Sequence, residues 1–230
     1  MAILYIVATP IGHLKDVTIR ALEILKGVDL ILCEDTRRTQ KLLNHFDIKT
    51  KTLSYHQHSK LKKIRYILEL LRNGKNLALV SDAGTPGVSD PGNKLVEEVV
   101  KLLGDQARIV PVPGASALTA AASISGFPMD RFLFLGFPPQ KRKRKKFFEE
   151  VVGSKYPIVL YESPYRIVKS LRDLRESDAK QNAKQTRKIV VCRELTKKFE
   201  TVYRGTIEEV IEKIKKDKIK GEFVVIINPK

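Results

Sequence analysis

Two adjacent carboxylates, Glu34 and Asp35, follow a short apolar run and are followed closely by Arg37. A carboxylate held near a substrate can accept or donate a proton, and an arginine can hold a phosphate or a developing oxyanion. The same residues also fit a simpler explanation, because Asp35 or Thr36 can cap the helix that we expect to follow. The pattern leaves both interpretations open.

A turn-rich segment from Ser81 to Gly92 has three glycines and two prolines in twelve residues. This composition predicts a rigid backbone whose N–H and C=O groups can face a ligand closely. Its second half comes close to a phosphate-binding P-loop but lacks the Gly-Lys-Ser/Thr ending, Pro91 has no N–H to donate, and Asp90 would repel phosphate. The chain contains no GxGxxG motif. Loops of this length within a compact domain are usually functional, which favours a binding loop of another kind.

The tract Tyr55-His56-Gln57-His58 suggests a metal site at first sight. No cysteine or carboxylate cluster lies near it in the sequence, so we expect no metal and favour a polar pocket wall or an RNA contact. For Lys197 and Lys198 we expect a solvated face.

Charge is the strongest signal in the composition, with 43 Lys+Arg against 26 Asp+Glu and a net charge of +17. Residues 1–112 contribute 17 − 12 = +5 and residues 113–230 contribute 26 − 14 = +12. Much of this excess comes from six consecutive cations at 141–146, which we expect to form a solvated loop or an interaction segment. A polyanionic partner would relieve their repulsion through counterion release, so nucleic acid is the favoured partner. An acidic membrane surface is the alternative, but no amphipathic anchor accompanies the run.

Several protein classes are disfavoured. No stretch approaches the ~20 apolar residues of a membrane helix, and the first residues lack the basic flank and cleavage site of a signal peptide. The two cysteines, Cys33 and Cys192, cannot form a disulfide scaffold and lie in apolar runs, as buried free thiols in a reducing compartment do. We therefore expect a cytoplasmic protein with no membrane association.

Apolar runs alternate with helical periodicity through the first half, which is typical of a mostly parallel sheet covered by helices on both faces. We expect Asp16 to cap the first helix, whose Ile19, Leu22 and Leu25 share one face. We expect Asp90 to cap the fourth helix, with Pro91 at its first position. The expected strands are 3–8, 28–33, 52–54, 77–80 and 108–112, and the expected helices are 17–26, 36–45, 61–72 and 94–103.

A Pro-Val-Pro-Gly turn at 111–114 separates the two halves. The second half predicts a mixed sheet, because two of its strands are joined by a connection short enough for an antiparallel pair. The expected strands are 132–136, 158–161, 189–193, 201–204 and 223–227, the expected helices are 116–125, 164–175 and 206–216, and residues 177–188 are expected to be loop. The chain thus predicts an α/β fold of two domains, 1–112 and 113–230.

Six motifs occur together in order along the chain. They are Val7–Gly12 (VATPIG), Glu34–Arg37 (EDTR), Ser81–Gly92 (SDAGTPGVSDPG), Val112–Gly114 (VPG), Tyr161–Pro164 (YESP) and Arg193–Lys197 (RELTK). Together they resemble the ribosomal RNA small subunit methyltransferase I family, within the tetrapyrrole-methylase-like (class III) methyltransferases. The resemblance runs from residue 3 to about residue 227. It implies two α/β domains with S-adenosylmethionine (AdoMet) in the cleft between them, a homodimer, no metal, and 2′-O-methylation of a cytidine ribose in the decoding region of 16S rRNA.

The resemblance also implies site residues. For the cofactor these are Pro10, Ser81, Asp82, Ala83, Ser89, Ser116, Ala117, Tyr161, Glu162 and Leu195. The chain departs from the family pattern at His13, usually Asn, at Ala115, usually Pro, and at Tyr165, usually His. It also departs at Gln57 and Ser59, and the sequence stops after 223–230, where many relatives continue with a C-terminal helical segment.

For catalysis we expect Glu34, Asp35 and Arg37 to act on the ribose hydroxyl, with His56 and Glu162 as further candidates for the base. For RNA binding we expect Lys141, Arg142, Lys143, Arg144, Lys145, Lys146 and Arg166 to hold phosphates. Three other functions remain open: a C-methylase of precorrin-type tetrapyrroles, a diphthamide-pathway methylase that acts on protein, and a non-catalytic RNA-binding module.

Overall fold

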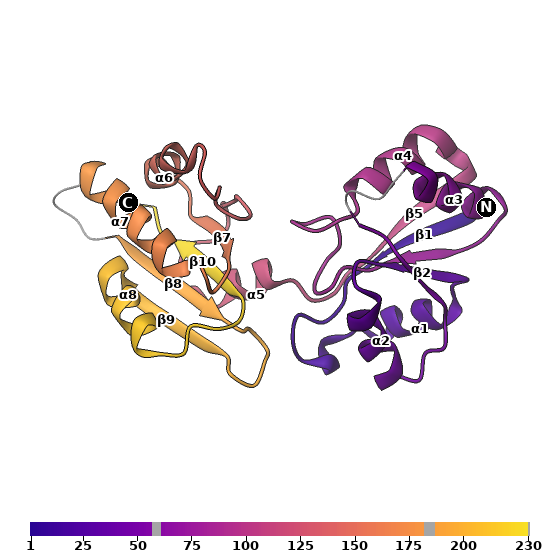
Figure 1. The fold of residues 1–230 in the computed structure, drawn as a ribbon, viewed down its shortest axis with the longest axis horizontal. Coiled ribbons are helices and arrows are strands. Elements are labelled where there is room, and N and C mark those ends of the chain that lie inside the picture. The colour runs from indigo at the N-terminus through magenta and orange to yellow at the C-terminus, as the bar shows by residue number, and fades with distance from the viewer. Residues whose placement is uncertain (57–60, 182–186, 230) are drawn as a thin grey trace. The chain divides into compact units, whose positions relative to one another are not determined.

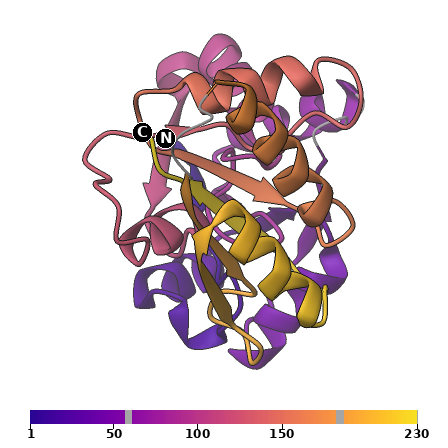
Figure 2. The same cartoon turned by 90° about the vertical axis from the view of Figure 1, so that its left-hand side faces the viewer.

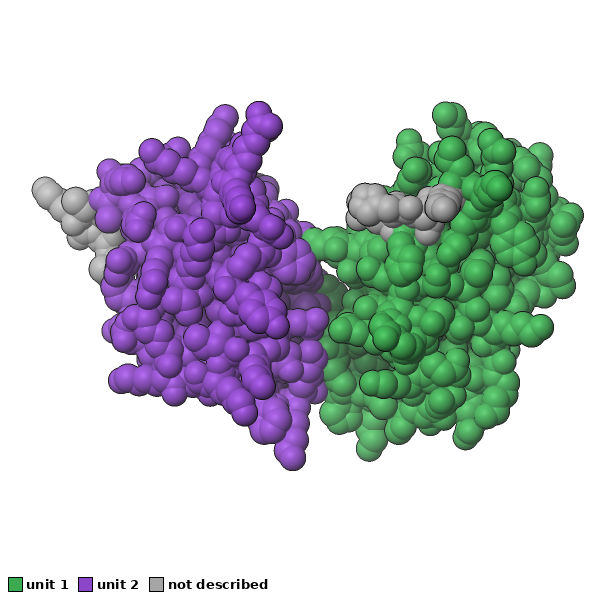
Figure 3. Space-filling model, in the orientation of Figure 1, with its two compact units in different colours: residues 1–116 green, residues 117–230 purple. Residues whose placement is uncertain are grey.

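A computed structural model describes residues 1–56, 61–181 and 187–229. The chain divides into two compact units, Met1–Ser116 and Ala117–Lys230 (Figure 3). The first unit extends four residues past the boundary predicted at residue 112. Two contacts keep this extension in the unit: the Thr85 hydroxyl donates to the Ala115 carbonyl at 3.4 Å, and Gly114 packs so closely on Ala8 that a Cβ there would lie 3.0 Å from the Ala8 Cβ.

The first unit is built on five parallel strands, as the alternating pattern predicted. In the order β3-β2-β4-β1-β5 they are Thr52–Ser54, Leu30–Cys33, Leu77–Leu79, Ala2–Val7 and Ala107–Val112. Leu4 at the centre of β1 is in register with Leu77 on one side and Ile109 on the other. All strands in this sheet are parallel, so their carboxyl ends lie at one edge.

Helices cover both faces of this sheet (Figure 1). Helices α1 (Ile19–Gly27) and α2 (Thr36–His45) pack on one face, with Leu25 and Leu43 fully buried against it. Helices α3 (Leu61–Arg72) and α4 (Asn93–Leu103) pack on the other face. Two short 3₁₀ helices, η1 (Leu14–Asp16) and η2 (Gly104–Gln106), lie in the connections.

Two predicted helix starts in this unit were wrong. Thr18 rather than Asp16 caps α1, because the Thr18 side chain accepts the Ala21 N–H at 3.1 Å. Ile19 then falls in the first turn of α1 and is 77% exposed, so it does not share the buried face with Leu25. Helix α4 begins at Asn93 after Gly92 and has no side-chain cap, so neither Asp90 nor Pro91 starts it.

The second unit contains a mixed sheet of five strands, as predicted. In the order β6-β7-β10-β8-β9 they are Leu133–Phe134, Ile158–Glu162, Phe223–Ile227, Lys188–Arg193 and Thr201–Thr206. Strand β6 is parallel to β7, and the other neighbouring pairs are antiparallel. Because β10 runs antiparallel to both β7 and β8, these two strands and β6 all end at the same edge.

Three helices pack on one face of this second sheet: α6 (Arg144–Gly153), α7 (Ile167–Gln181) and α8 (Ile207–Lys216). Figure 2 shows α7 (orange) and α8 (yellow) side by side in front of the strands. A short helix, α5 (Ala117–Ser123), contacts β10. The loop predicted at 177–188 was partly wrong, since α7 continues to Gln181 and β8 begins at Lys188; residues 182–186 lie outside the described part of the chain.

Candidate active site

The predicted site residues of the first unit gather at the carboxyl edge of its sheet. The neighbouring strands β1 and β4 lead to α1 and α4 on opposite faces, and such a switch point is where open α/β sheets bind ligands. The loops after these two strands are tied by a reciprocal pair of backbone hydrogen bonds, from Thr9 N–H to the Gly84 carbonyl and from Gly84 N–H to the Thr9 carbonyl, both at 2.9 Å. Pro10 follows directly on this bridge.

The loop after β4 is folded back on itself by local contacts. The Ser81 hydroxyl donates to the carbonyls of Ala83 at 3.1 Å and Gly84 at 3.3 Å. Gly87 has a φ of +83°, and a Cβ on it would lie 2.7 Å from the Asn93 side-chain oxygen. Only glycine fits there without displacing Asn93, whose amide also donates to the Gly87 carbonyl at 3.0 Å. These contacts fold the segment back on itself, and the rigidity expected from its glycine and proline content stays a prediction.

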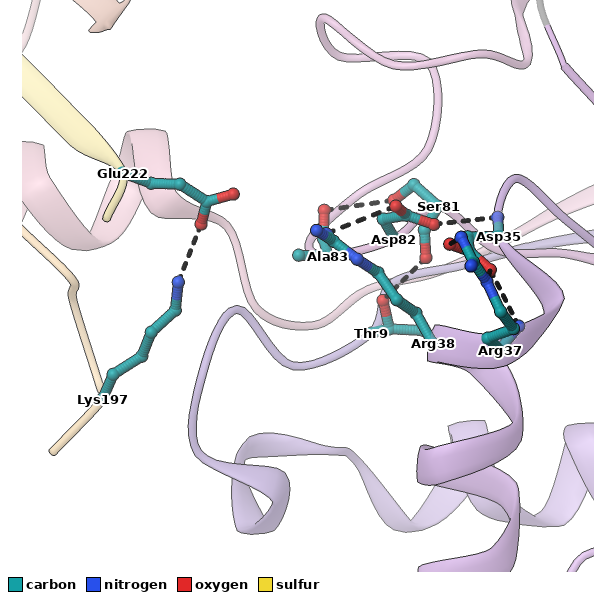
Figure 4. A network of polar contacts seen from close by, with 9 residues as sticks. All are labelled: Thr9, Asp35, Arg37, Arg38, Ser81, Asp82, Ala83, Lys197 and Glu222. Carbon is teal, nitrogen blue, oxygen red and sulfur yellow. Dashed lines mark hydrogen bonds and ion pairs between the residues drawn. The ribbon is translucent and has the colours of Figure 1, made fainter. Parts of the chain in front are cut away.

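Carboxylates and arginines form a paired cluster at this edge (Figure 4). Asp82 accepts the Asp35 backbone N–H at 3.0 Å and pairs with Arg38 at 3.3 Å. Asp35 accepts the Arg37 backbone N–H at 2.9 Å and two side-chain bonds from Arg37 at 3.0 and 2.7 Å. Asp35 is thus the N-cap of α2, which was the simpler of the two interpretations left open by the sequence.

The two adjacent carboxylates differ in acidity. Hydrogen bonds from Arg37 hold the pKa of Asp35 well below its usual range. Glu34 is half-buried, and its burial, followed by the charge of Asp82, raises its pKa above the ordinary value of 4.5. A general base works best when its pKa lies near the working pH, so of the two carboxylates Glu34 is the one suited to accept a proton.

Backbone donors in the same loop suit a small polar ligand. Asp82 and Ala83 are half-buried residues, and their backbone N–H groups have no hydrogen-bond partner among the described residues. A pair of available N–H groups beside a glycine-containing turn can receive carboxylate or hydroxyl oxygens. AdoMet carries both kinds of oxygen, so these residues fit it.

The predicted site residues of the second unit also share one sheet edge. Tyr161 and Glu162 end β7, and Leu195 lies in the turn just after β8. Phe223 at the start of β10 is in register with both Glu162 and Arg193, so it lies between the two strand ends. Strand β6 ends at the same edge, where Tyr161 N–H donates to the Gly136 carbonyl at 2.9 Å.

The Glu162 carboxylate belongs to the interior of the second unit. Only 1% of its side chain is exposed. It accepts hydrogen bonds from the Ser163 N–H at 2.7 Å and the Ser170 hydroxyl at 2.6 Å, and it pairs with Arg166 at 3.0 Å. The candidate role of Glu162 as a base is therefore wrong, because its oxygens are enclosed and already occupied. Arg166 is engaged by the same carboxylate.

The six-cation run is not uniformly solvated. Lys141, Arg142, Lys143, Lys145 and Lys146 are exposed. Arg144 is only 6% exposed and donates to Asp173 at 2.5 Å and to the Ser170 hydroxyl at 2.8 Å. The expectation that Arg144 holds an RNA phosphate was wrong, because it starts α6 and its side chain points into the unit.

The comparisons with known proteins agree with the motif pattern. The family model "Tetrapyrrole (Corrin/Porphyrin) Methylases" matches residues 3–211. A relative from Thermotoga maritima named "Ribosomal RNA small subunit methyltransferase I" is 44% identical over 230 residues, which cover 100% of both chains. A relative of the same name from Halalkalibacterium halodurans is 45% identical over 97% of this chain and 75% of its own. The chain belongs to the ribosomal RNA small subunit methyltransferase I family.

Solved structures share the fold of this chain at low sequence identity. The methyltransferase CobJ has a TM-score of 0.68 at 18% identity and covers 99% of this chain and 93% of its own. A diphthine synthase has a TM-score of 0.73 at 14% identity, covering 100% of this chain and 90% of its own. Both confirm the predicted two-sheet α/β fold.

Other residues singled out in the sequence take different places. His13 caps η1 by accepting the Lys15 N–H at 3.2 Å, a bond that the Asn usual in the methyltransferase I family can also make. Lys198 is exposed, as expected for a solvated face, but Lys197 is half-buried and pairs with Glu194 and Glu222 at 2.8 Å each; Figure 4 shows the pair with Glu222. Among the described residues no group of three or more His, Cys, Asp or Glu could hold a metal. Gln57, His58 and Ser59 lie outside the described residues.

The remaining site positions stay predictions. Ser89 lies in the loop after β4 with a φ of +61°, Ser116 ends the first unit, and Ala117 begins α5. Sequence reasoning missed Arg38, whose partner Asp82 is far away in the chain. No helix in the described ranges is long and apolar enough to cross a membrane.

Proposed function

We propose that this chain transfers the methyl group of AdoMet to the 2′-hydroxyl of a cytidine ribose in the decoding region of 16S rRNA. The observation that carries the proposal is 44–45% identity, over nearly the whole chain, to relatives named for methylation of small-subunit ribosomal RNA. The folded-back loop after β4 and the exposed cations of the second unit support it.

The backbone of residues 81–83 would hold AdoMet in the first unit, together with Pro10 and Ser89. When bound, AdoMet supplies a methyl group on a sulfonium, which is a strong electrophile. The protein must hold the ribose oxygen in line with that methyl group, and orientation alone can lower a barrier by about 7–11 kcal/mol.

Glu34 is the proposed base. As a carboxylate it accepts the proton of the 2′-hydroxyl while the oxygen forms its bond to the methyl carbon and the carbon–sulfur bond breaks. Asp35 contributes differently, because its ion pair with Arg37 and its cap on α2 fix the backbone that carries Glu34.

The five exposed cations at 141–146 would bind RNA phosphates. A small anionic tetrapyrrole needs no such surface, so the cations favour RNA over the C-methylase that the fold also allows. A homodimer in the cytoplasm completes the proposal, and light scattering coupled to size-exclusion chromatography tests the dimer.

Labelled AdoMet incubated separately with small ribosomal subunits, naked rRNA and a precorrin tests the substrate. We expect label only in RNA, at a linkage that resists alkali, because alkaline cleavage of the backbone needs a free 2′-hydroxyl. Label in the precorrin, or in an RNA linkage that alkali still cleaves, contradicts the proposal. Absence of labelling with all three substrates favours the non-catalytic RNA-binding alternative.

The base is tested by Glu34→Gln, with the exposed Glu97→Gln as its matched control. Removal of a general base lowers the rate about 10²–10⁴-fold. We expect that loss in Glu34→Gln, unchanged binding of AdoMet by calorimetry, and wild-type activity in Glu97→Gln. Full activity in Glu34→Gln would exclude it as the base.

A further inference from the structure

A chain of buried polar contacts crosses the second unit from β7 to the start of α6. Arg144, Glu162 and Ser170 are all at least nine-tenths buried. The Arg144 guanidinium donates to the Ser170 hydroxyl, which donates in turn to Glu162. At one end of this series of contacts Arg144 pairs with Asp173, and at the other end Glu162 pairs with Arg166. The positive charges of Arg144 and Arg166 equal in number the negative charges of Glu162 and Asp173.

This network holds a surface loop by its backbone. The Arg166 guanidinium donates to the Pro138 carbonyl at 3.3 Å, and the Arg144 guanidinium donates to the Pro139 carbonyl at 2.8 Å. Neither proline has an N–H, so the carbonyls are the only hydrogen-bonding groups through which these two residues can be fixed. Residues 137–143, called here the basic loop, are therefore anchored at 138–139 and again at Arg144, where α6 begins.

Between these anchors the basic loop exposes Lys141, Arg142 and Lys143. Lys143 has a φ of +65°, an uncommon conformation for a residue with a side chain. Three neighbouring cations repel one another, so without restraint this segment would populate many conformations. The buried anchors hold the backbone at 138–139 and at Arg144, which reduces the number of these conformations.

A buried charge network of this kind is weak evidence for stability, because desolvation of the charges offsets their attraction. In some proteins, buried ionic groups instead specify one conformation. A loop that is preset in its bound form loses less entropy on binding, which raises affinity without adding a contact.

We propose that Arg144 and Ser170 are positioning residues, which preset the conformation of the basic loop so that its exposed cations bind the phosphates of single-stranded RNA. This inference rests on the proposed function in RNA methylation. It assigns the six cations two separate tasks: Arg144 fixes the loop from inside, and the others contact the RNA.

Salt dependence separates positioning from contact. Each phosphate contact to single-stranded RNA contributes about 0.7 to the slope of log K against log salt. We expect Arg142→Gln, which removes a contacting cation, to flatten the slope by about 0.7. We expect Ser170→Ala to weaken binding of a single-stranded 16S rRNA fragment by about tenfold and to leave the slope unchanged. Ser177→Ala is the matched control, because Ser177 is another buried serine of α7 outside the network. We expect it to bind RNA as the wild type does.

Thermal melting checks that each variant is folded. Should Ser170→Ala not fold, Asp173→Asn repeats the test at the half-buried end of the network. Equal RNA affinity of Ser170→Ala and Ser177→Ala would overturn the inference while the proposed function stands. A flattened slope in Ser170→Ala would overturn it too, because contacts would then have been lost. Failure of the wild-type protein to bind RNA or to methylate it would overturn the proposed function, and this inference with it.

Discussion

Gly221→Ala should destabilise the second unit for two separable reasons. Gly221 has a φ of +88°, and a Cβ on it would lie 2.3 Å from the Glu194 Cγ and Cδ atoms. Alanine in the left-handed region costs about 1–2 kcal/mol. The Glu194 side chain must also move, although its carboxylate accepts Lys197 Nζ at 2.8 Å and the Glu222 N–H at 2.9 Å. Loss of one such bond costs about 1 kcal/mol, so we expect a total of about 2–3 kcal/mol.

Urea denaturation of two further variants isolates the steric part. Gly74 has a φ of +79° with no other described atom within 4 Å of an added Cβ, so Gly74→Ala should lose only the conformational part, about 1–2 kcal/mol. In a Glu194→Ala background the cost of Gly221→Ala should fall to the same value, because the clash is gone. If Gly221→Ala costs no more than Gly74→Ala in the wild-type background, the steric argument is refuted.

Three shorter predictions concern other ionisable groups. A base works only when deprotonated, so kcat/KM should fall as the pH drops through the pKa of Glu34, which is raised above 4.5. The Glu34→Gln variant should lose this acidic limb of the pH profile. A wild-type profile that is flat down to pH 4.5 contradicts the prediction. Arg187→Met should cost about 3–5 kcal/mol in urea because it leaves the buried Asp178 carboxylate without its 3.0 Å partner, and adding Asp178→Asn should recover part of the loss. Burial raises the pKa of Cys192 to about 11 and also raises that of Cys33, so Ellman's reagent should label neither thiol at neutral pH until urea is added; rapid labelling of the native protein contradicts their burial.

The sheets were predictable from the sequence because their strands are short apolar runs separated by strong turn signals. Strand β10 (Phe223–Ile227) and helix α3 (Leu61–Arg72) match the predicted ranges, since burial of one continuous apolar run or one helical face decides both. The first residue of a helix was harder to predict. Asp16 and Thr18 are both good caps by residue type, and only tertiary packing decides which one accepts the N–H.

The charged residues set the limit of sequence reasoning about the site. Adjacent carboxylates at 34–35 marked the right sheet edge, yet nothing in their types showed that Arg37 would engage Asp35 and leave Glu34 half-buried. Arg144 lies among five other cations, and its partners Ser170 and Asp173 are 26 and 29 residues away. Pairings at that separation depend on the fold and leave no local pattern.

Because Arg144 is buried, the positions of the six-cation run should not tolerate substitution equally. Lysine and arginine carry the same charge, so at the exposed positions 141–143, 145 and 146 an exchange between them should be nearly silent. At position 144 the planar guanidinium of arginine donates hydrogen bonds to three partners in different directions. The single ammonium group of a lysine, on its flexible side chain, cannot reproduce that geometry. The six consecutive cations look equivalent in the sequence, but at position 144 only arginine can make the observed hydrogen bonds.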